Sequence, residues 1–288
     1  MIRSSDEYIK SLRGRKLEVY LFGERVEEPV DHPMIRPSVN AVAATYDLAQ
    51  SDPELASVVS PFTGERINRF LHIAGSREDV VMQNKMQRRL GQLTGTCFQR
   101  CVGMDAINSL HSVTFEIDEA SGTPYHQRFL DFVSFAQSQG YVIGGAMTDV
   151  KGDRSKAPHA QSDPDLYVHV TRRDEKGVYI SGAKAHQTGC INSHWLIVMP
   201  TLRLGEADRD YAITGAIPVD ADGITYVYGR QSCDTRSMEG GDLDVGNANY
   251  GGQEAMVIFK DVFIPNEYIF MDGEVDFAAM LVERFTCY

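Results

Sequence analysis

The sequence predicts an α+β fold, in which a mainly helical first half is followed by short antiparallel strands. Three observations predict it. Helical spacing of apolar residues dominates up to about residue 143, short alternating segments separated by turn residues follow from Gly144, and helical spacing returns after residue 272. Strands and helices do not alternate. We therefore expect a helical domain at 1–143, a β-barrel-like domain at 144–272 and the start of another helical domain at 273–288.

Helices are expected in the first half at residues 4–12, 42–50, 76–112 and 126–139. Ser4 with Glu7, and Ser76 with Asp79, have the spacing of residues that cap the first turn of a helix. The long third helix is expected to be interrupted over 116–119 and at Pro124, because proline does not fit inside a helix.

Strands are expected mainly after residue 144, with 17–22 as an earlier one. Residues 166–171 and 178–180 flank a polar turn and predict a hairpin. Further strands are predicted at 195–199, 211–214, 225–228 and 255–259. Two prolines within 31–37 predict a rigid loop in the first half.

The end of the chain carries one apolar stripe, made by Phe277, Met280, Leu281, Phe285 and Tyr288. No glycine, asparagine or proline closes this helix. We therefore expect that the carboxy-terminal part of the natural protein is missing from this sequence.

Composition narrows the class of protein. A net charge of −12 opposes binding to nucleic acid, which needs a surplus of cations. No apolar run approaches the roughly 18 residues of a membrane span, and the amino terminus lacks the apolar core of a signal peptide, so a cytoplasmic protein is predicted. Five cysteines, an odd number, do not suggest a disulfide scaffold.

Cys97 and Cys101 are the most informative residues. In the predicted helix, residues four apart share a face, so both sulfurs are expected to point into one space. Two such thiols can hold iron or zinc, form a redox pair, or pack as small buried side chains, and the spacing alone leaves these open. Cys190, Cys233 and Cys287 have no partner at ligand spacing and are interpreted as core or neutral positions.

Three further segments could bind a ligand. Residues 148–155 combine a glycine, two cations and hydroxyl groups, as in loops that meet a phosphate or a polar ring, although a solvated turn has the same composition. Small residues surround His186 within 182–189, and His, Gln and Thr there could bond a flat ligand, with a structural His as the alternative. Glu254 follows two glycines and could be a general acid or base, although a surface Glu is commoner.

Lys184 completes an S-x-x-K match without its companion motifs, which we interpret as chance.

Nine segments together resemble the 4-hydroxybutyryl-CoA dehydratase branch of the 4-hydroxyphenylacetate 3-hydroxylase family. They are residues 31–38, 97–106, 145–149, 151–154, 182–189, 228–236, 251–255, 262–266 and 282–285. The resemblance covers the whole chain but only about three-fifths of the usual length of the family. It implies a fold like that of the acyl-CoA dehydrogenases, with a helical domain, a flavin-binding β-domain and a helical bundle.

The resemblance also implies FAD and, in this branch, a [4Fe–4S] cluster. Cys97 and Cys101 match two ligands of the cluster, and the other two, a His and a third Cys, are expected beyond residue 288. Gln99 and Glu254 match positions that line the active site. The residues that match flavin-binding positions are Met147, Thr148, Asp149, Lys151, Gly152, Asp153, Arg154, His186, Gln187 and Thr188, with Thr188 near the isoalloxazine.

The implied activity is dehydration of 4-hydroxybutyryl-CoA to crotonyl-CoA by a radical route, with isomerisation of vinylacetyl-CoA at the same site. Expected partners are an acyl-CoA substrate and further copies of the chain in a homotetramer, without nucleic acid or membrane. The alternatives are a flavin-dependent aromatic hydroxylase of the 4-hydroxyphenylacetate 3-monooxygenase type, which needs no cysteine pair, and a truncated chain without catalytic activity.

Overall fold

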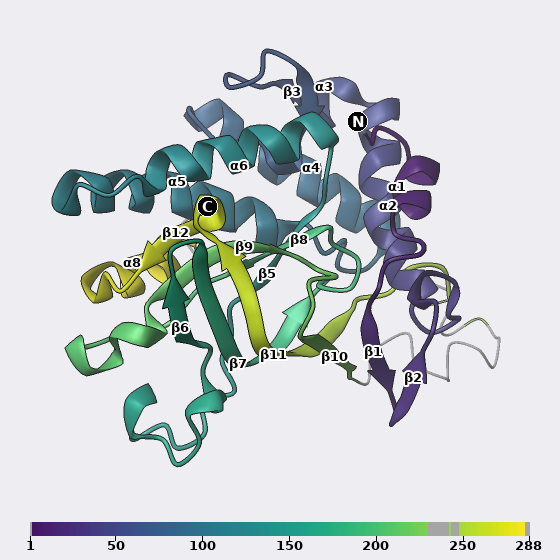
Figure 1. Ribbon diagram of the computed structural model, residues 1–288. Helices are drawn as coiled ribbons and strands as arrows, with labels where there is room; N and C mark the ends of the chain where they lie inside the picture. The colour runs from purple at the N-terminus through teal and green to yellow at the C-terminus, as the bar shows by residue number, and fades with distance from the viewer. Residues whose placement is uncertain (1, 230–241, 243–247, 286–288) are drawn as a thin grey trace.

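The computed structural model describes residues 2–229, 242 and 248–285. Helices gather on one side of the strands (Figure 1). The helices are α1 (Ser5–Ser11), α2 (Arg36–Ser51), α3 (Pro53–Ala56), α4 (Arg77–Thr94), α5 (Cys101–Ser121), α6 (Tyr125–Gln139) and α8 (Val275–Phe285). The expected combination of helices and sheets is thus confirmed. Residues 230–236 of the family resemblance, Cys233, Cys287 and Tyr288 lie outside the described residues.

Local capping sets where the helices begin and end. Ser4 and Glu7 form the predicted capping box of α1, and the Ser76 side chain accepts a hydrogen bond from the backbone of Asp79 at the start of α4. Left-handed glycines end α4, α5 and α6, at 95, 122 and 140 respectively.

The expected helix over 76–112 is wrong, because it is two helices. Gly95 has φ 63° and ends α4, and the chain then turns through residues 95–100 before α5 begins at Cys101. Cys97 therefore lies in this α4–α5 connection, and the expected shared helical face of the two cysteines does not exist. The expected interruption over 116–119 is also wrong, since α5 continues to Ser121.

The expected loop over 31–37 is confirmed only in part. Its last two residues already belong to α2, which begins at Arg36. Pro37 lies in the first turn, where the missing N–H of proline removes no hydrogen bond from the helix. The sequence therefore placed the start of α2 six residues too late.

Strands form two larger sheets and one hairpin. The six-stranded sheet has the order β2 (Glu24–Val26), β1 (Glu18–Leu21), β10 (Ile224–Tyr228), β11 (Glu254–Pro265), β7 (Gly177–Thr188) and β6 (His169–Asp174). The four-stranded sheet has the order β12 (Ile269–Asp272), β9 (Ile213–Pro218), β8 (Trp195–Val198) and β5 (Ile143–Ala146), and β3 (Ser57–Val59) pairs with β4 (Arg66–Asn68).

The predicted hairpin is confirmed as β6 and β7. An antiparallel arrangement is confirmed only in part, because β1 pairs with β10, and β5 with β8, in parallel. Strand β5 was not predicted, because its two central residues are glycines, which weaken a strand pattern. Since β1 comes from the first half and β10 from the second, their sheet joins both parts, and the division into three domains stays a prediction.

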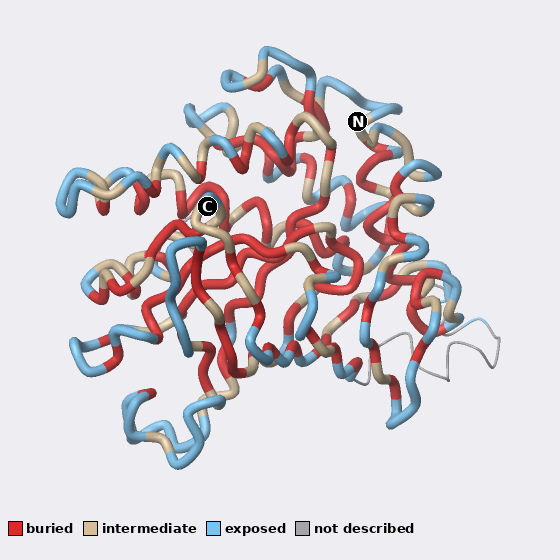
Figure 2. Tube along the Cα trace, viewed as in Figure 1, coloured by how far each residue is buried: buried red, intermediate tan, exposed pale blue. Residues whose placement is uncertain are grey.

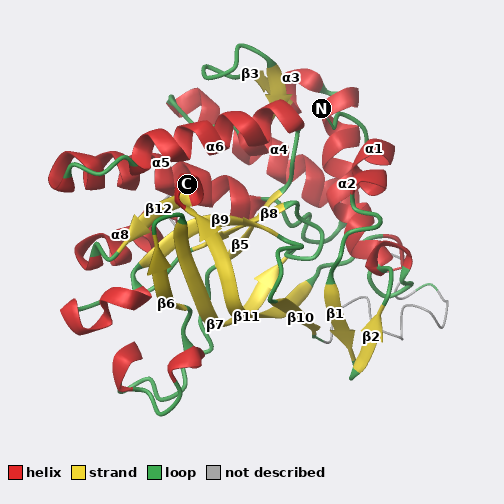
Figure 3. Cartoon of the chain, viewed as in Figure 1, coloured by secondary structure: helices red, strands yellow, loops and turns green. Residues whose placement is uncertain are grey.

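The core lies between helices and sheets. Helices α5 and α6 cover the four-stranded sheet, whose other face meets the six-stranded one, and burial is concentrated along this layer (Figure 2). At Gly103, a Cβ would lie 2.0 Å from the carbonyl oxygen of Ile143, so only glycine lets α5 approach β5 this closely. Figure 3 shows the same separation of helix and strand.

Helix α8 returns to α5 from the last strand. The Ser109 hydroxyl donates to the carbonyl of Leu281 at 2.8 Å, and Leu281 is fully buried. Phe277, Met280 and Phe285 also pack against the core, so the expected apolar stripe is confirmed for its described members. None of the helices in the described ranges has the length and apolar content needed to cross a membrane.

Candidate functional site

The two predicted metal ligands are neighbours in space, although the helical reason for expecting this was wrong. The thiol of Cys101 donates a hydrogen bond to the sulfur of Cys97, which lowers the pKa of Cys97 to about 7 and raises that of Cys101. The backbone N–H of Gln99 lowers the pKa of Cys97 further. Such a pair can share a metal ion or undergo thiol chemistry, because the thiolate is the reactive and the ligating form.

Gln99 holds the connection that carries Cys97. Its Nε2 donates to the carbonyls of Ser38, at 3.0 Å, and Gly251, at 3.1 Å, and its Oε1 accepts from Asn192 Nδ2 at 2.8 Å. The residue is fully buried and has φ 64°. These contacts give Gln99 a structural task, and its predicted place among catalytic residues stays a prediction.

The end of β7 and the segment before β11 meet this connection. A Cβ on Gly189 would lie 2.7 Å from the Cβ of Gln99, so the two segments touch at a glycine. Gly189 N also donates to the carbonyl of Gln253 at 2.9 Å. The α4–α5 connection therefore lies directly against the residues that lead into Thr188 and Glu254.

Thr188 and Glu254 face each other across β7 and β11. The Thr188 hydroxyl donates to Glu254 Oε1 at 2.6 Å. Burial raises the pKa of Glu254, while the Thr188 hydrogen bond and nearby His186 oppose the shift. The charge of Glu254 also acts on Cys97. A carboxyl group of this kind can take up and return a proton nearer to neutral pH than an exposed Glu.

A pocket of about 300 Å³ opens beside Glu254 on the outer side of β7, β10 and β11. Its lining is Ala185, His186, Val227, Gly229, Glu254, Ala255 and Met256. Ala185, Gly229 and Ala255 are small, so a ligand can approach the backbone there, and this volume is at the lower end of small-molecule sites. His186 is exposed with φ 55° and supplies ring nitrogens at the rim. The pocket suits a flat ring system, and the carboxyl group of Glu254 lies at the edge of the pocket.

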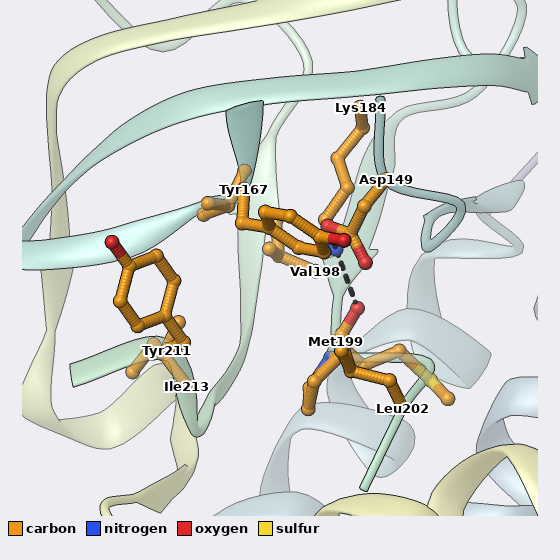
Figure 4. Close-up of a pocket in the computed structure, with 10 residues that line it drawn as sticks. Asp149, Tyr167, Lys184, Val198, Met199, Leu202, Tyr211 and Ile213 are labelled. Atoms are coloured by element: carbon orange, nitrogen blue, oxygen red, sulfur yellow. Dashed lines mark hydrogen bonds and ion pairs between the residues drawn. The ribbon is translucent and has the colours of Figure 1, made fainter. Parts of the chain in front are cut away.

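Several predicted flavin-binding residues in the 147–154 loop are instead bonded to protein. Lys184 on β7 donates to Asp149 Oδ1 at 2.5 Å and to the carbonyl of Met147 at 2.8 Å. It also donates to the carbonyl of Met199 at 2.9 Å (Figure 4). The Gln187 side chain accepts from Met147 N at 2.7 Å. Burial lowers the pKa of Lys184, and Asp149 opposes the shift.

Much of the 147–154 loop faces solvent. Thr148, Gly152, Asp153 and Arg154 are exposed, and Lys151 is half-buried. Thr148 O accepts from Ala185 N at 2.8 Å, which ties the loop to the strand position next to His186. The loop can therefore offer cationic side chains to an anionic ligand, and the flavin-binding roles stay predictions.

Two residues near the cysteines were missed by the sequence reasoning. Arg100 is buried between the rings of Tyr46 and Phe70, with its guanidinium carbon 4.9 and 5.0 Å from their centres. Asp105 follows Cys101 by one helical turn, and burial raises its pKa to about 7. The i+4 spacing from Cys101 could have identified Asp105, whereas nothing in the sequence marks Arg100 as buried. The described part of the chain holds no group of three or more His, Cys, Asp or Glu side chains that could bind a metal ion.

Comparison with known families identifies a family model that matches most of the chain. The 4-hydroxyphenylacetate 3-hydroxylase N-terminal family covers residues 4–271. The chain is 54% identical over 292 aligned residues to a 4-hydroxybutyryl-CoA dehydratase/vinylacetyl-CoA-Δ-isomerase of Clostridium aminobutyricum, covering 100% of this chain and 59% of that protein. It is 27% identical to the oxygenase component of 4-hydroxyphenylacetate 3-monooxygenase of Thermus thermophilus, covering 96% of this chain and 56% of the relative.

Solved structures agree with these relatives. An archaeal 4-hydroxybutyryl-CoA dehydratase of N. maritimus, described as oxygen-tolerant, has a TM-score of 0.97 and 70% identity, covering 100% of this chain and 58% of that one. The oxygenase component of a 4-hydroxyphenylacetate 3-monooxygenase, solved with FAD, has a TM-score of 0.77 at 21% identity, covering 98% and 58% respectively, and shows a shared fold. The chain spans less than three-fifths of the length of each relative named here.

Proposed function

The chain belongs to the 4-hydroxyphenylacetate 3-hydroxylase family, and on that premise we propose that the protein dehydrates 4-hydroxybutyryl-CoA to crotonyl-CoA. We propose isomerisation of vinylacetyl-CoA at the same site. The observation that carries this proposal is that the two free thiols Cys97 and Cys101 interact with each other close to the hydrogen-bonded Thr188–Glu254 pair, with Glu254 acting on Cys97. Relatives with the corresponding names support it.

The residues fit a flavin. The pocket beside Glu254 has small residues in its wall, and Arg154 and Lys151 lie on the loop that is hydrogen-bonded to Ala185 of that wall. We propose that FAD binds there, which the FAD complex of a structurally similar oxygenase supports. Cys97 and Cys101 fit two ligands of a [4Fe–4S] cluster, and the described residues supply no third. When bound, these groups would supply one-electron chemistry and a Lewis acid for the substrate hydroxyl.

Glu254 is the residue of this chain proposed to move a proton. Conversion of 4-hydroxybutyryl-CoA to crotonyl-CoA removes hydrogens from C2 and C3, releases the C4 hydroxyl as water and returns hydrogen to C4. A carboxyl group with a raised pKa can both accept and donate a proton. Thr188 orients it by the 2.6 Å hydrogen bond to Oε1. The isomerisation of vinylacetyl-CoA removes a proton from C2 and returns one to C4, while the hydrogen on C3 stays in place and no water is lost.

Other expectations belong to this proposal. They are an acyl-CoA substrate, a homotetramer, a cytoplasmic location and an arrangement like that of the acyl-CoA dehydrogenases. The dehydratase relatives support the acyl-CoA substrate through their names. The aromatic hydroxylase is the second candidate, favoured by relatives named 4-hydroxyphenylacetate 3-monooxygenase and 2,4,6-trichlorophenol monooxygenase.

A two-substrate assay tests the proposal. The purified protein with FAD is given 4-hydroxybutyryl-CoA without oxygen, and separately 4-hydroxyphenylacetate with reduced FAD and oxygen. We expect crotonyl-CoA in the first reaction and no hydroxylated product in the second. Hydroxylation without crotonyl-CoA would replace the proposal by the aromatic hydroxylase, and neither product would favour a chain without catalytic activity.

A further inference from the structure

We propose that the buried Lys184–Asp149 pair is a positioning device, which fixes the 147–154 loop against β7 and thereby sets the affinity for the loop's ligand. That this ligand is FAD rests on the proposed function. Neither the sequence motifs nor the family resemblance assigned a task to Lys184. Asp149 would then act on the ligand through the loop and would not touch it.

The Lys184 ammonium group donates three hydrogen bonds, all to the loop or to residues beside it. Its three hydrogen bonds go to the Asp149 carboxylate, to the carbonyl of Met147 and to the carbonyl of Met199 at the end of β8. Both side chains of the pair are 2% exposed. One side chain therefore joins β7, the first residues of the loop and the end of β8 at a single point.

The space around the pair does not admit a ligand. The cavity there measures about 10 Å³, close to the smallest volume that holds one water molecule. Tyr167 and apolar side chains enclose it, including Val198, Leu202 and Ile213 (Figure 4). A charged pair sealed in this way does not contact a ligand directly, and it holds the backbone that leads to the exposed part of the loop.

The backbone that the pair holds leads directly to the exposed face of the loop. Ala185 N and the Gln187 side chain bond residues 147 and 148, so Lys184 completes a row of anchors along β7. After Asp149 the chain passes through Lys151, with φ 77°, and Gly152, with φ 48°. Displacement at residue 149 would therefore move the turn that presents Arg154.

Farther along, the loop has independent support. The Gln161 side chain accepts from Asp153 N at 3.1 Å and donates to Asp153 O at 2.8 Å, and Tyr167 donates to Lys151 O at 3.2 Å. Loss of the pair should therefore loosen the first half of the loop without unfolding the segment after it. This limits the expected change to a local opening.

A variant that tests this proposal must remove the charges of both Lys184 and Asp149. Lys184→Met alone leaves the Asp149 carboxylate buried without its cation, which can unfold a protein, whereas apolar replacement of a whole buried pair is often neutral. The double variant Lys184→Met with Asp149→Leu is therefore the test, and Lys176→Met in the turn between β6 and β7 is the control for removing an exposed lysine. Thermal melting establishes that the double variant is folded.

Two readouts separate this inference from the proposed function. The first is trypsin cleavage after Lys151 in the protein without FAD, which we expect to become at least tenfold faster in the folded double variant. The second is the Kd for FAD, measured by fluorescence, which we expect to rise at least tenfold with an altered visible spectrum of the bound flavin. Lys176→Met should change neither readout.

An unchanged cleavage rate at the loop would overturn the inference, whatever the protein binds. Faster cleavage with an unchanged Kd for FAD would overturn the link from the loop to the flavin. If the wild type does not bind FAD, the flavin part of the proposed function fails, while faster cleavage in the double variant still supports the positioning of the loop.

Discussion

Among single residues, Arg100 shows most clearly how the site is held in place. Its guanidinium donates to the Thr45 hydroxyl at 3.0 Å and to the Tyr141 carbonyl at 3.3 Å, and it stacks between two aromatic rings. Among the described residues it pairs with no carboxylate. Because Arg100 directly precedes Cys101, these contacts fix the start of α5.

Replacing Arg100 tests this interpretation. We expect Arg100→Met to lower the free energy of unfolding by about 2 kcal/mol, from the loss of two charge-assisted hydrogen bonds and the ring contacts. Arg100→Lys should recover less than half of this, because an ammonium does not stack as a planar group. Urea unfolding measures both, with exposed Arg88→Met as the control. Equal stability of Arg100→Met and the wild type would contradict the account.

His194 predicts a dependence of stability on pH. Burial, with Arg15 and Arg100 nearby, lowers the pKa of His194 to about 3. Its Nδ1 accepts from Val142 N at 2.9 Å, so Nε2 carries the proton and donates to the Ser11 hydroxyl. The unfolded chain binds a proton near pH 6.5 whereas the folded chain does not, so stability is complete above pH 6.5 and falls as the pH decreases toward 3.

The contribution of His194 can be measured by comparison with a neutral variant. We expect the wild type to lose about 1 kcal/mol more per pH unit than His194→Gln between pH 6 and 4, since Gln can make both hydrogen bonds without titrating. Denaturant unfolding at several pH values gives the slopes. Parallel curves for the two proteins would show that His194 is protonated in the folded state.

At the scale of elements, the break between α4 and α5 decides where the cysteines lie. Gly91 and Gly95 give a matched pair, because a Cβ at either position meets open space, but only Gly95 has a left-handed φ. We expect Gly95→Ala to destabilise the protein by about 1 kcal/mol and Gly91→Ala, inside α4, to stabilise it by about 0.5 kcal/mol. Urea unfolding checks both signs, and stabilisation by Gly95→Ala would contradict the break.

The same elements show what the sequence could predict. Capping residues such as Ser4 and Ser76 act on their own first turn, so helix starts at α1 and α4 were predictable. The glycines did not show where α4 ends, because Gly91 lies inside the helix whereas Gly95 ends it. Strand β5 was missed since its burial comes from layers on both sides, while Gly144 and Gly145 carry no pattern.

At the scale of the whole molecule, the pairing of strands that are far apart in the chain could not be predicted from the sequence. Glu18 in β1 pairs in parallel with Thr225 in β10, and no local signal predicts such a partner. The meeting of Cys97 with Glu254 likewise depends on the contact of Gly189 with Gln99. The family resemblance supplied the site residues, and the structure distinguishes those that face a pocket, such as Glu254, from those bonded inside, such as Asp149.

The most direct test of the central claim is crotonyl-CoA formation by Glu254→Gln, measured anaerobically at saturating FAD with 4-hydroxybutyryl-CoA. Glu267→Gln, an exposed change of the same size, is the control. If Glu254 moves a proton, its kcat should fall by about 100-fold or more while the Kd for FAD stays within about threefold of the wild type. A kcat equal to that of the wild type would show that the carboxyl group held by Thr188 takes no part in the reaction.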